Sequence, residues 1–366
     1  MNDIQDLADI RARIDAIDAR LVELLNQRAE LARCIGRAKA EKGIPIFVPH
    51  REHEVFCRLA AINRGPLPDA ALRGIWREIM SASFALERPL TICHFGQPGA
   101  FTHLAARLKF GSSVQYLAAD AIAQVFAHVE RGAADYGVVP IENSTDGTIT
   151  DTIDAFLAGT VRIINELYVR IRHHLMAGVP LAAVRRVYSR ATVFGQCRRW
   201  LAVHLPGVEL VEVASTTRAA ERAAAEAAEG SAAIGSEEAA QSVGLPIVAS
   251  DIQDDPHNQT RFIVVARPQA AAEPTGDDKT SLMLAINDRP GALYEALGPF
   301  HDAGINLCKI ESRPSRRRAW EYLFFIDFLG HARDPRVAAT LAELARRCAI
   351  CEVLGSYPRA SAPLNS

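Results

Sequence analysis

Lysine is scarce in this 366-residue chain, and long apolar runs are absent from it. No run approaches the roughly 20 apolar residues that a helix needs to cross a bilayer, so we expect no membrane segment. Lysine and arginine suit protein surfaces about equally well, and the shortage of lysine therefore has no evident structural cause. Each retained lysine is a candidate for a specific role. They are Lys39, Lys42, Lys109, Lys279 and Lys309, out of 41 lysines and arginines together.

An excess of charge is also missing, because 41 basic side chains face 43 acidic ones and the net charge is −2. Such a chain has no overall field for nucleic acid or an anionic membrane, which favours small molecules or copies of itself as partners. The seven cysteines are scattered and odd in number, as expected of reduced thiols. Cys348 and Cys351 form the one CxxC pair, and without a second pair we expect no metal site. The N-terminal ten residues lack the pattern of a secretory signal, so a cytoplasmic location is expected.

Residues 1–88 are predicted to be helical, because apolar residues recur there every three or four positions. Breaks are expected at Gly43-Ile44-Pro45 and at Gly65-Pro66, with a new helix after Pro49. The first helix is too long to bury its apolar stripe alone, so dimerisation is expected. The stripe comprises Leu7, Ile10, Ile14, Ile17, Leu21, Leu24, Leu25, Leu31 and Ile35.

Residues 90–267 alternate short apolar strands with helices, which predicts an α/β region with parallel pairing. The expected strands are 90–94, 136–141, 161–167, 186–188, 232–234 and 262–266. A polar linker, 268–279, precedes a third segment, 280–358. There we expect a strand at 281–286, a helix from Arg289, strands at 305–312 and 320–328, a helix at 335–347 and a strand at 350–354. This βαββαβ order is that of a ferredoxin-like module.

Two cations of the first predicted helix project from nearly one face. Arg28 and Lys39 are eleven positions apart, which is about 20° around a helix and about 16 Å along it. Arg11 lies about 25 Å before Arg28 and about 100° off that face. If all three bind one small anion, Arg11 must come from another subunit. The spacing alone also fits solvated helix faces.

Four motifs follow one another in the helical segment: Arg11-x-x-Ile14-x-x-x-Asp18, Leu24-Leu25-x-x-Arg28-x-x-Leu31-Ala32, Ile35-Gly36-x-x-Lys39 and Arg51-Glu52. The series resembles the all-helical chorismate mutases, which implies a dimer whose sites each take an arginine from the partner. The rearrangement of chorismate to prephenate requires clamped carboxylates and a cation beside the ether oxygen, where negative charge develops. The resemblance assigns the carboxylates to Arg11, Arg28 and Arg51, the ether oxygen to Lys39, a substrate hydroxyl to Glu52 and the far side to Glu87.

Two positions depart from that pattern. Val48 stands where some relatives carry an aspartate that contacts the substrate hydroxyl. Glu87 stands where some carry glutamine, and a glutamate must be protonated to donate a hydrogen bond to the ether oxygen. Mutase activity is therefore expected to favour lower pH.

A second series of motifs lies between residues 90 and 267: Gly96-x-x-Gly99-Ala100-Phe101-Thr102, Val139-Pro140-Ile141-Glu142-Asn143-Ser144-x-x-Gly147, Val187-Tyr188-Ser189, Gln196-Cys197, Ser215-Thr216 and Asn258-x-Thr260-Arg261-Phe262. Together they resemble prephenate dehydratases, which have two lobes around a cleft, similar to periplasmic ligand-binding proteins. The expected lobes are residues 90–167 with 247–267, and residues 168–246. His173-His174 lacks a third metal ligand at suitable spacing, so a structural role is expected.

Prephenate loses carbon dioxide and its ring hydroxyl as a benzene ring forms, which requires no cofactor. The site must bind two carboxylates, protonate the leaving hydroxyl and exclude water. The resemblance makes Thr260 the proton donor within a hydrogen-bonded network, with Glu142 as a relay. Two roles remain open for Arg261, a substrate contact and a salt bridge. Two also remain open for Phe262, a core anchor and a wall that packs against the substrate ring. The full set is Glu142, Asn143, Ser144, Ser189, Gln196, Thr260, Arg261 and Phe262.

In the third segment Arg289-Pro290-Gly291-Ala292-Leu293 opens a helix, and Gly304-Ile305-Asn306-Leu307-Cys308-Lys309-Ile310-Glu311-Ser312-Arg313-Pro314 follows. Both stretches resemble the ligand-recognition stretches of the ACT domain of phenylalanine-inhibited dehydratases. Free amides at a glycine-led helix start suit a carboxylate, and Asn306 and Glu311 suit an ammonium group. The expected phenylalanine site comprises Gly291, Ala292, Leu293, Asn306, Glu311, Ser312, Arg313 and Pro314.

The sequence therefore predicts a multidomain protein with an all-α helical mutase domain (1–88), a two-lobed α/β dehydratase domain (90–267) and an α+β ferredoxin-like ACT domain (280–358). We expect a homodimer or larger oligomer that converts chorismate through prephenate to phenylpyruvate without a cofactor, inhibited by phenylalanine. Three alternatives remain open at this point. They are an arogenate dehydratase, a dehydratase whose mutase domain has decayed at Val48, and a non-catalytic two-lobed binding protein with an attached sensor.

Overall fold

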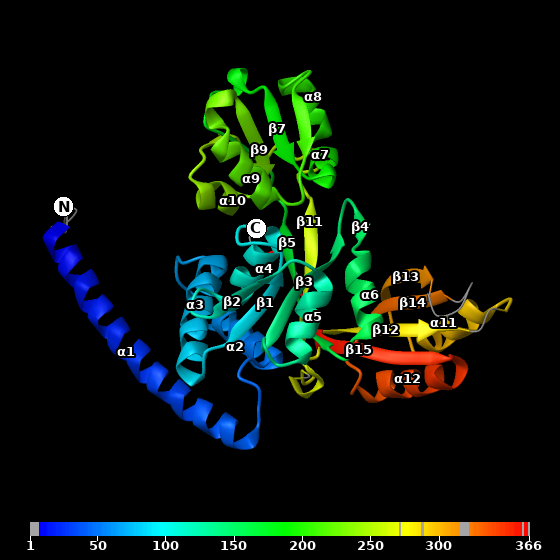
Figure 1. Ribbon diagram of the computed structural model, residues 1–366. Coiled ribbons are helices and arrows are strands. Elements are labelled where there is room, and N and C mark those ends of the chain that lie inside the picture. The colour runs from blue at the N-terminus through cyan, green and yellow to red at the C-terminus, as the bar shows by residue number, and fades with distance from the viewer. Residues whose placement is uncertain (1–6, 271, 287–288, 315–321, 361, 365–366) are drawn as a thin grey trace, which may run out of the picture.

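The computed structural model describes residues 7–270, 272–286, 289–314, 322–360 and 362–364. They form a helical N-terminal part, two lobes with one sheet each, and a C-terminal part with a third sheet (Figure 1). The predicted multidomain architecture is confirmed. None of the described helices is long and apolar enough to span a membrane.

The N-terminal part consists of α1 (Leu7–Lys42), α2 (Pro49–Ile62) and α3 (Asp69–Glu87). The breaks fall where glycine and proline interrupt the periodicity, as predicted. Gly43 follows α1 with a φ of +64°, and Pro49 occupies the first turn of α2, where its missing N–H costs nothing. The C-terminal half of α1 packs on α3, while its N-terminal half extends away from the rest of the chain (Figure 1).

The first lobe is a mixed sheet in the order β2-β1-β3-β11-β5, with β4 paired to β3. Strand β1 is parallel to β2 and β3, whereas β11 is antiparallel to β3 and β5. The predicted parallel pairing is therefore only partly correct, because β11 returns from the second lobe. The strands are β1 (Thr91–Phe95), β2 (Gln115–Ala119), β3 (Tyr136–Asn143), β4 (Gly147–Thr148), β5 (Arg162–Arg170) and β11 (Gln259–Ala266), and the helices are α4 (Phe101–Phe110), α5 (Ile122–Glu130) and α6 (Thr150–Ala158).

Both faces of this sheet are buried, and alternate residues of each strand enter different cores. Val138 and Val264 pack with α4 and with Phe47 of the mutase part. Val139 and Ile263 pack with α5, α6 and the C-terminal sheet. The first lobe thus lies between the mutase part on one face and the C-terminal sheet on the other.

The second lobe has a five-stranded sheet in the order β10-β6-β9-β7-β8. Because β10 pairs with β6, the chain returns to the first lobe after β10, and the predicted lobe boundary at residue 247 is placed too early. The strands are β6 (His174–Ala177), β7 (Arg186–Ser189), β8 (Glu209–Glu212), β9 (Ser231–Gly235) and β10 (Ile247–Ala249), the helices are α7 (Ala191–Gln196), α8 (Arg198–His204), α9 (Thr216–Ala225) and α10 (Glu237–Val243), and 3₁₀ turns lie at Leu181–Ala183, Ala227–Glu229 and, after β11, Pro268–Ala270.

The C-terminal part has the predicted βαββαβ order, with all strand pairs antiparallel in the order β13-β14-β12-β15. Residues 320 and 321 of the predicted third strand lie outside the described residues. Strand β15 lies against β5, where a Cβ on Gly355 would be 2.0 Å from the carbonyl oxygen of Ile163, so only glycine fits this contact. The elements are β12 (Asp278–Ala285), α11 (Ala292–Asp302), β13 (Leu307–Pro314), β14 (Tyr322–Leu329), α12 (Pro335–Arg347) and β15 (Ile350–Pro358).

Candidate active sites

A pocket of about 460 Å³ lies between α1, α2, α3 and the segment that joins α1 to α2. Arg28 and Lys39 both reach it from α1, as their spacing predicted. In addition to apolar side chains, which include Val48, the pocket is lined by Arg28, Lys39, His50, Arg51, Glu52, Ser83 and Glu87. Five of the six residues assigned to the mutase site are therefore brought together within one subunit.

Two of the three cations of this pocket, Arg28 and Lys39, are held by groups outside their own helix. The Arg28 guanidinium donates to Ser83 Oγ at 2.7 Å. Lys39 Nζ donates to the carbonyl oxygen of Ile46 at 2.7 Å and lies 3.3 Å from a carboxylate oxygen of Glu87. Arg51 has an exposed ion pair with Glu54 on its own helix. A pocket with three cations suits a substrate with two carboxylates.

Glu87 lies at the end of α3, against the backbone of α1. A Cβ on Gly36 would be 2.7 Å from Glu87 Cγ, so the glycine permits this close approach. Burial raises the pKa of Glu87, and the neighbouring Lys39 opposes this effect without cancelling it. The raised pKa favours the protonated form, which can donate a hydrogen bond.

Arg11 is the sixth assigned residue, and it lies outside the lining of the pocket. It is exposed on the half of α1 that extends away from the chain (Figure 1). The apolar stripe of α1 is exposed too: Ile17 has 59% of its surface accessible and Leu21 has 49%. A long apolar face open to solvent is a feature of interaction surfaces.

The Thr260 side chain lies in a network of amides where β3 and β11 run side by side. Asn143 Nδ2 donates to Thr260 Oγ1 at 2.8 Å and to Asn258 Oδ1 at 2.9 Å. All three residues are buried. Because Thr260 Oγ1 accepts from an amide, its own hydrogen is left to donate, and no described protein group accepts it.

Gln196 joins the two lobes at this network. It comes from α7 of the second lobe, and its Oε1 accepts from Asn258 Nδ2 at 3.1 Å. Its Nε2 donates to Asp146 of the first lobe at 2.7 Å. Gln196 thus reaches the network from a separate part of the chain, and it is linked to Thr260 through Asn258 and Asn143.

His173 also belongs to this network, and its contacts fit the structural role that the sequence suggested. Its Nε2 lies 2.6 Å from Gln196 Oε1, and its ring packs edge-on against Phe101. Burial lowers the pKa of His173 to about 4, so the ring is neutral near pH 7. His173 lies shortly after β5, where the chain first passes from one lobe to the other. This position could have marked His173 as a residue of the network, but the sequence was searched there only for metal ligands.

Three other predicted residues lie apart from the Thr260 hydroxyl. Ser144 Oγ accepts from the backbone N–H of Gln259 at 3.0 Å, and Ser189 Oγ donates to the carbonyl of Ile234 at 2.9 Å. Phe262 is 1% exposed and packs in the apolar core between the sheet and α4. Of the three, Ser144 bonds the backbone directly before Thr260, Ser189 links β7 to β9, and Phe262 is a core residue.

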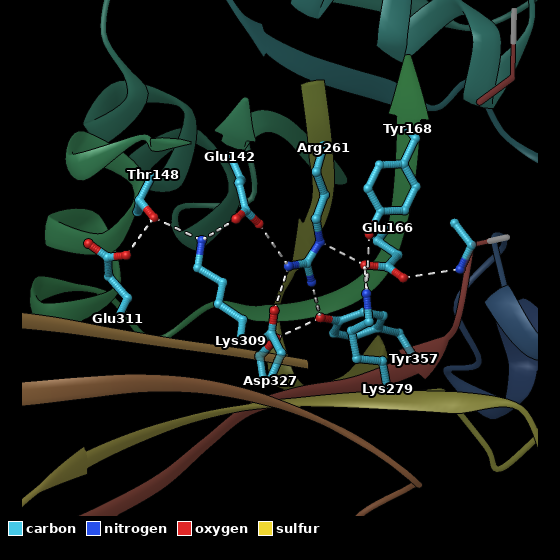
Figure 2. Close-up of polar contacts among 12 residues, drawn as sticks. Glu142, Thr148, Glu166, Tyr168, Arg261, Lys279, Lys309, Glu311, Asp327 and Tyr357 are labelled. Atoms are coloured by element: carbon cyan, nitrogen blue, oxygen red, sulfur yellow. Dashed lines mark hydrogen bonds and ion pairs between the residues drawn. The ribbon is translucent and has the colours of Figure 1, made fainter. Parts of the chain in front are cut away.

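Glu142 and Arg261 point away from Thr260, toward the C-terminal sheet (Figure 2). Successive residues of a strand face opposite sides, so Asn143 and Thr260 face one side while their neighbours face the other. Glu142 lies 3.1 Å from Lys309 Nζ of β13 and 3.7 Å from the Arg261 guanidinium. The structure therefore does not bring Glu142 to the Thr260 hydroxyl as the expected relay.

Arg261 is the centre of a buried ion cluster formed by β5, β11 and the C-terminal sheet (Figure 2). Its guanidinium donates to Glu166 at 2.7 Å, to Asp327 at 2.5 Å and to the Tyr357 hydroxyl at 2.8 Å. Lys279 is the second cation, 2.8 Å from Glu166. Two cations and two carboxylates balance, which a buried cluster requires. Of its two open roles, Arg261 has contacts that fit a salt bridge.

The surroundings of Asp327 favour its ionised form. Burial alone would raise the pKa of Asp327, but Arg261 and the Ser281 hydroxyl together keep it below the ordinary value. Asp327 and Ser281 belong to the C-terminal sheet, whereas Arg261 follows Thr260 directly. The C-terminal sheet is thereby linked to the strand that carries Thr260.

The residues expected to bind phenylalanine lie on α11 and β13. Gly291 precedes α11 with a φ of +82°, a conformation that favours glycine. Glu311 accepts a hydrogen bond from Thr148 of the first lobe at 2.9 Å, and Arg313 donates to Asp154 of α6 at 2.6 Å. The other predicted residues, Ala292, Leu293, Asn306, Ser312 and Pro314, are on the same two elements or directly before β13.

Metal ligands are not clustered in the part of the chain that the structure describes, where no three His, Cys, Asp or Glu side chains could hold an ion. The seven cysteines are all free thiols. The chemistry of both sites is that of positioned cations, carboxylates, amides and a hydroxyl.

Comparison with known families agrees with this division of the chain. Residues 10–88 match the model of chorismate mutase type II, residues 92–270 that of prephenate dehydratase and residues 280–346 that of the ACT domain. A bifunctional chorismate mutase/prephenate dehydratase from Aquifex aeolicus is 43% identical, with 98% of this chain and 99% of the relative covered. A protein of the same description from Stutzerimonas stutzeri is 42% identical and is covered over its full length, with 98% of this chain.

A solved structure extends the likeness to three dimensions. The prephenate dehydratase of Arthrobacter aurescens in complex with L-Phe has a TM-score of 0.70 and 39% identity, over 74% of this chain and 90% of that one. Full-length identity above 40% with relatives of one description, together with the three matching domains, decides the family. This chain belongs to the bifunctional chorismate mutase/prephenate dehydratases with a C-terminal ACT domain.

Proposed function

We propose that the pocket between α1, α2 and α3 is the chorismate mutase site and that the amide network around Thr260 is the prephenate dehydratase site. The observation that carries the first assignment is the convergence of Arg28, Lys39 and Glu87 on one pocket. Arg28 and Arg51 bind carboxylates, and Lys39 stabilises the charge that develops on the ether oxygen. Val48 lines the pocket as an apolar wall, and Glu52 supplies the acceptor for the substrate hydroxyl.

The mutase site is completed by a second subunit. The exposed stripe of α1 needs an apolar cover, and another α1 offers the same stripe in a symmetric contact. Such pairing lays the N-terminal half of one α1 along its partner and carries Arg11 toward the partner's pocket. The support for this proposal is the exposure of the stripe and the position of Arg11 outside its own pocket.

Thr260 is the proposed proton donor to the leaving hydroxyl of prephenate. The Asn143 amide donates to the Thr260 oxygen. Asn258 accepts from Asn143 and donates to Gln196, which connects the network to the second lobe. Closure of the lobes over this network would exclude water during decarboxylation. Glu142 does not relay this proton, since it is engaged with Lys309 on the opposite face of the sheet. The proton that Thr260 gives to the leaving hydroxyl is replaced from solvent after the product has left.

Mutase activity should fall as pH rises through the pKa of Glu87. The protonated carboxyl donates to the ether oxygen, whereas the ionised form repels the developing charge. Because burial raises the pKa of Glu87, the decline lies above the titration range of an ordinary glutamate, with about tenfold loss per pH unit. The measurement is the rate of chorismate consumption against pH in wild type and Glu87→Gln. The glutamine variant should lose this decline, and an unchanged profile removes Glu87 from the role.

Phenylalanine is the proposed inhibitor, bound between the start of α11 and β13. The support is the relative from Arthrobacter aurescens, whose structure holds L-Phe, and the helix start that follows Gly291. Phenylalanine should slow prephenate dehydration, and Asn306→Ala should weaken the inhibition about tenfold through loss of a polar contact to the amino group. The assay is the inhibition constant, with the mutase rate of the same protein as a control for folding. A wild type insensitive to phenylalanine contradicts the sensing proposal alone.

A cytoplasmic location, the oligomeric state and the domain boundaries at residues 88, 90, 267 and 280 stay predictions. Preference for prephenate over arogenate is tested by comparing the rates of the purified protein on both substrates. Prephenate carries a keto group where arogenate carries an amine.

A further inference from the structure

The few lysines of this chain share one kind of environment. Four of the five form ion pairs with glutamates, and three of these pairs connect different domains. They are Lys39–Glu87 within the mutase part, Lys109–Glu52 between the dehydratase and mutase parts, and Lys279–Glu166 and Lys309–Glu142 between the C-terminal sheet and the first lobe. The Lys109 pair is the one that reaches a mutase residue from another domain.

Lys109 lies in the last turn of α4, in the dehydratase part, and its ammonium group contacts Glu52 in the first turn of α2. Both side chains are 10% exposed, so solvent screens the pair little. Glu52 lines the mutase pocket. Lys109 engages one carboxylate oxygen, Oε2, and the other, Oε1, has no hydrogen bond to any described group, which leaves it to accept one from a substrate.

Phe47 fixes the surroundings of this pair. Lys109 Nζ lies 5.3 Å from the centre of the Phe47 ring. The centre of this ring is 5.1 Å from that of Phe110 and 5.5 Å from that of Tyr136. The Tyr136 hydroxyl donates to the backbone oxygen of Phe47 at 3.2 Å. Phe47 belongs to the segment between α1 and α2, whereas Phe110 and Tyr136 belong to the first lobe. The start of α2 is therefore anchored on the dehydratase part.

We infer that Lys109 is a positioning residue of the mutase site, supplied by the dehydratase domain. Its ammonium group holds the Glu52 carboxylate so that Oε1 faces the pocket and receives the substrate hydroxyl. This inference rests on the proposed role of Glu52. It implies that chorismate binding depends on the docking of the dehydratase domain onto α2.

The test uses the full-length protein with Lys109 replaced by methionine, which keeps most of the volume over Phe47 and removes the charge. The KM for chorismate should rise about 5- to 30-fold, the range for weakening a hydrogen bond to a charged group, with little change in kcat. Lys109→Arg should restore most of the affinity. Dehydration of supplied prephenate should keep its wild-type rate, and Lys42→Met, at an exposed lysine, should leave both activities unchanged.

A double variant separates positioning from a general effect on the fold. If Lys109 acts through Glu52, then Lys109→Met should add little to the loss caused by Glu52→Gln. Additive losses, or an unchanged KM in Lys109→Met while Glu52→Gln is impaired, overturn the inference. An unimpaired Glu52→Gln protein instead contradicts the proposed role of Glu52 and, with it, the inference.

Discussion

Replacing Thr260 by valine should lower the rate of prephenate dehydration about 10²- to 10⁴-fold, the range for loss of a positioned proton donor. Valine keeps the shape of threonine and removes its hydroxyl. The loss follows from the structure because Asn143 donates to the Thr260 oxygen, and the threonine hydrogen is thereby directed to another acceptor. The acid nearest to this network, Asp146, accepts from Gln196 Nε2 at 2.7 Å and has no hydrogen bond to Thr260.

Two comparisons show whether the lost hydroxyl is the cause. Thr260→Ser keeps the hydroxyl and should retain most of the rate. Valine also leaves the buried Asn143 amide without one acceptor, which lowers the free energy of unfolding by about 1–3 kcal/mol. The mutase rate of the same protein is therefore measured as a control for folding. A Thr260→Val protein that dehydrates prephenate at the wild-type rate contradicts the assignment.

Removal of the Lys39 charge should abolish most of the mutase activity. Lys39→Met takes away the cation beside the ether oxygen, and a preorganised charge of this kind contributes about 10²- to 10³-fold to a rate. Arg11→Ala should cause a similar loss, although Arg11 lies outside the pocket of its own subunit. Prephenate dehydration should continue in both variants, because neither residue contacts the Thr260 network.

Mixed dimers of these two variants test the partner's contribution. When Arg11→Ala and Lys39→Met chains are co-expressed with different tags, half of the dimers are mixed, and each mixed dimer has one site with both residues intact. The expected mutase activity is roughly one quarter of wild type, from two inactive parents. If Arg11 served its own subunit, every site in the mixture would lack one residue. The mixture would then stay inactive.

The helical part could be predicted from sequence because its signals are local. Apolar spacing, Gly43 and Pro49 determine where the helices end and begin, and a 3.6-residue turn brings Arg28 and Lys39 to one face. The strands were harder. The short edge strands β2 and β8 and the irregular β10 carry too few alternating residues to stand out.

Contacts between domains could not be predicted, because they depend on how separate folds dock. Arg261 is adjacent to Thr260 in sequence, yet its partners Asp327 and Tyr357 come from 66 and 96 positions away. The pairing of Lys109 with Glu52 has the same origin. The contact between His173 and Gln196 could not be predicted either, because the two residues belong to different elements and meet only in the folded protein. The motifs led to the two proposed sites, but which face of β3 and β11 meets the C-terminal sheet could be learned only from the structure.

The central claim is that one chain holds two separate active sites, and feeding each substrate alone tests it most directly. Chorismate and prephenate are supplied separately to wild type, Lys39→Met and Thr260→Val, without added metal or nucleotide. Wild type should form phenylpyruvate from both, Lys39→Met only from prephenate, and Thr260→Val should accumulate prephenate from chorismate. Binding of either substrate by wild type without turnover, or the loss of both activities in either variant, would contradict the account.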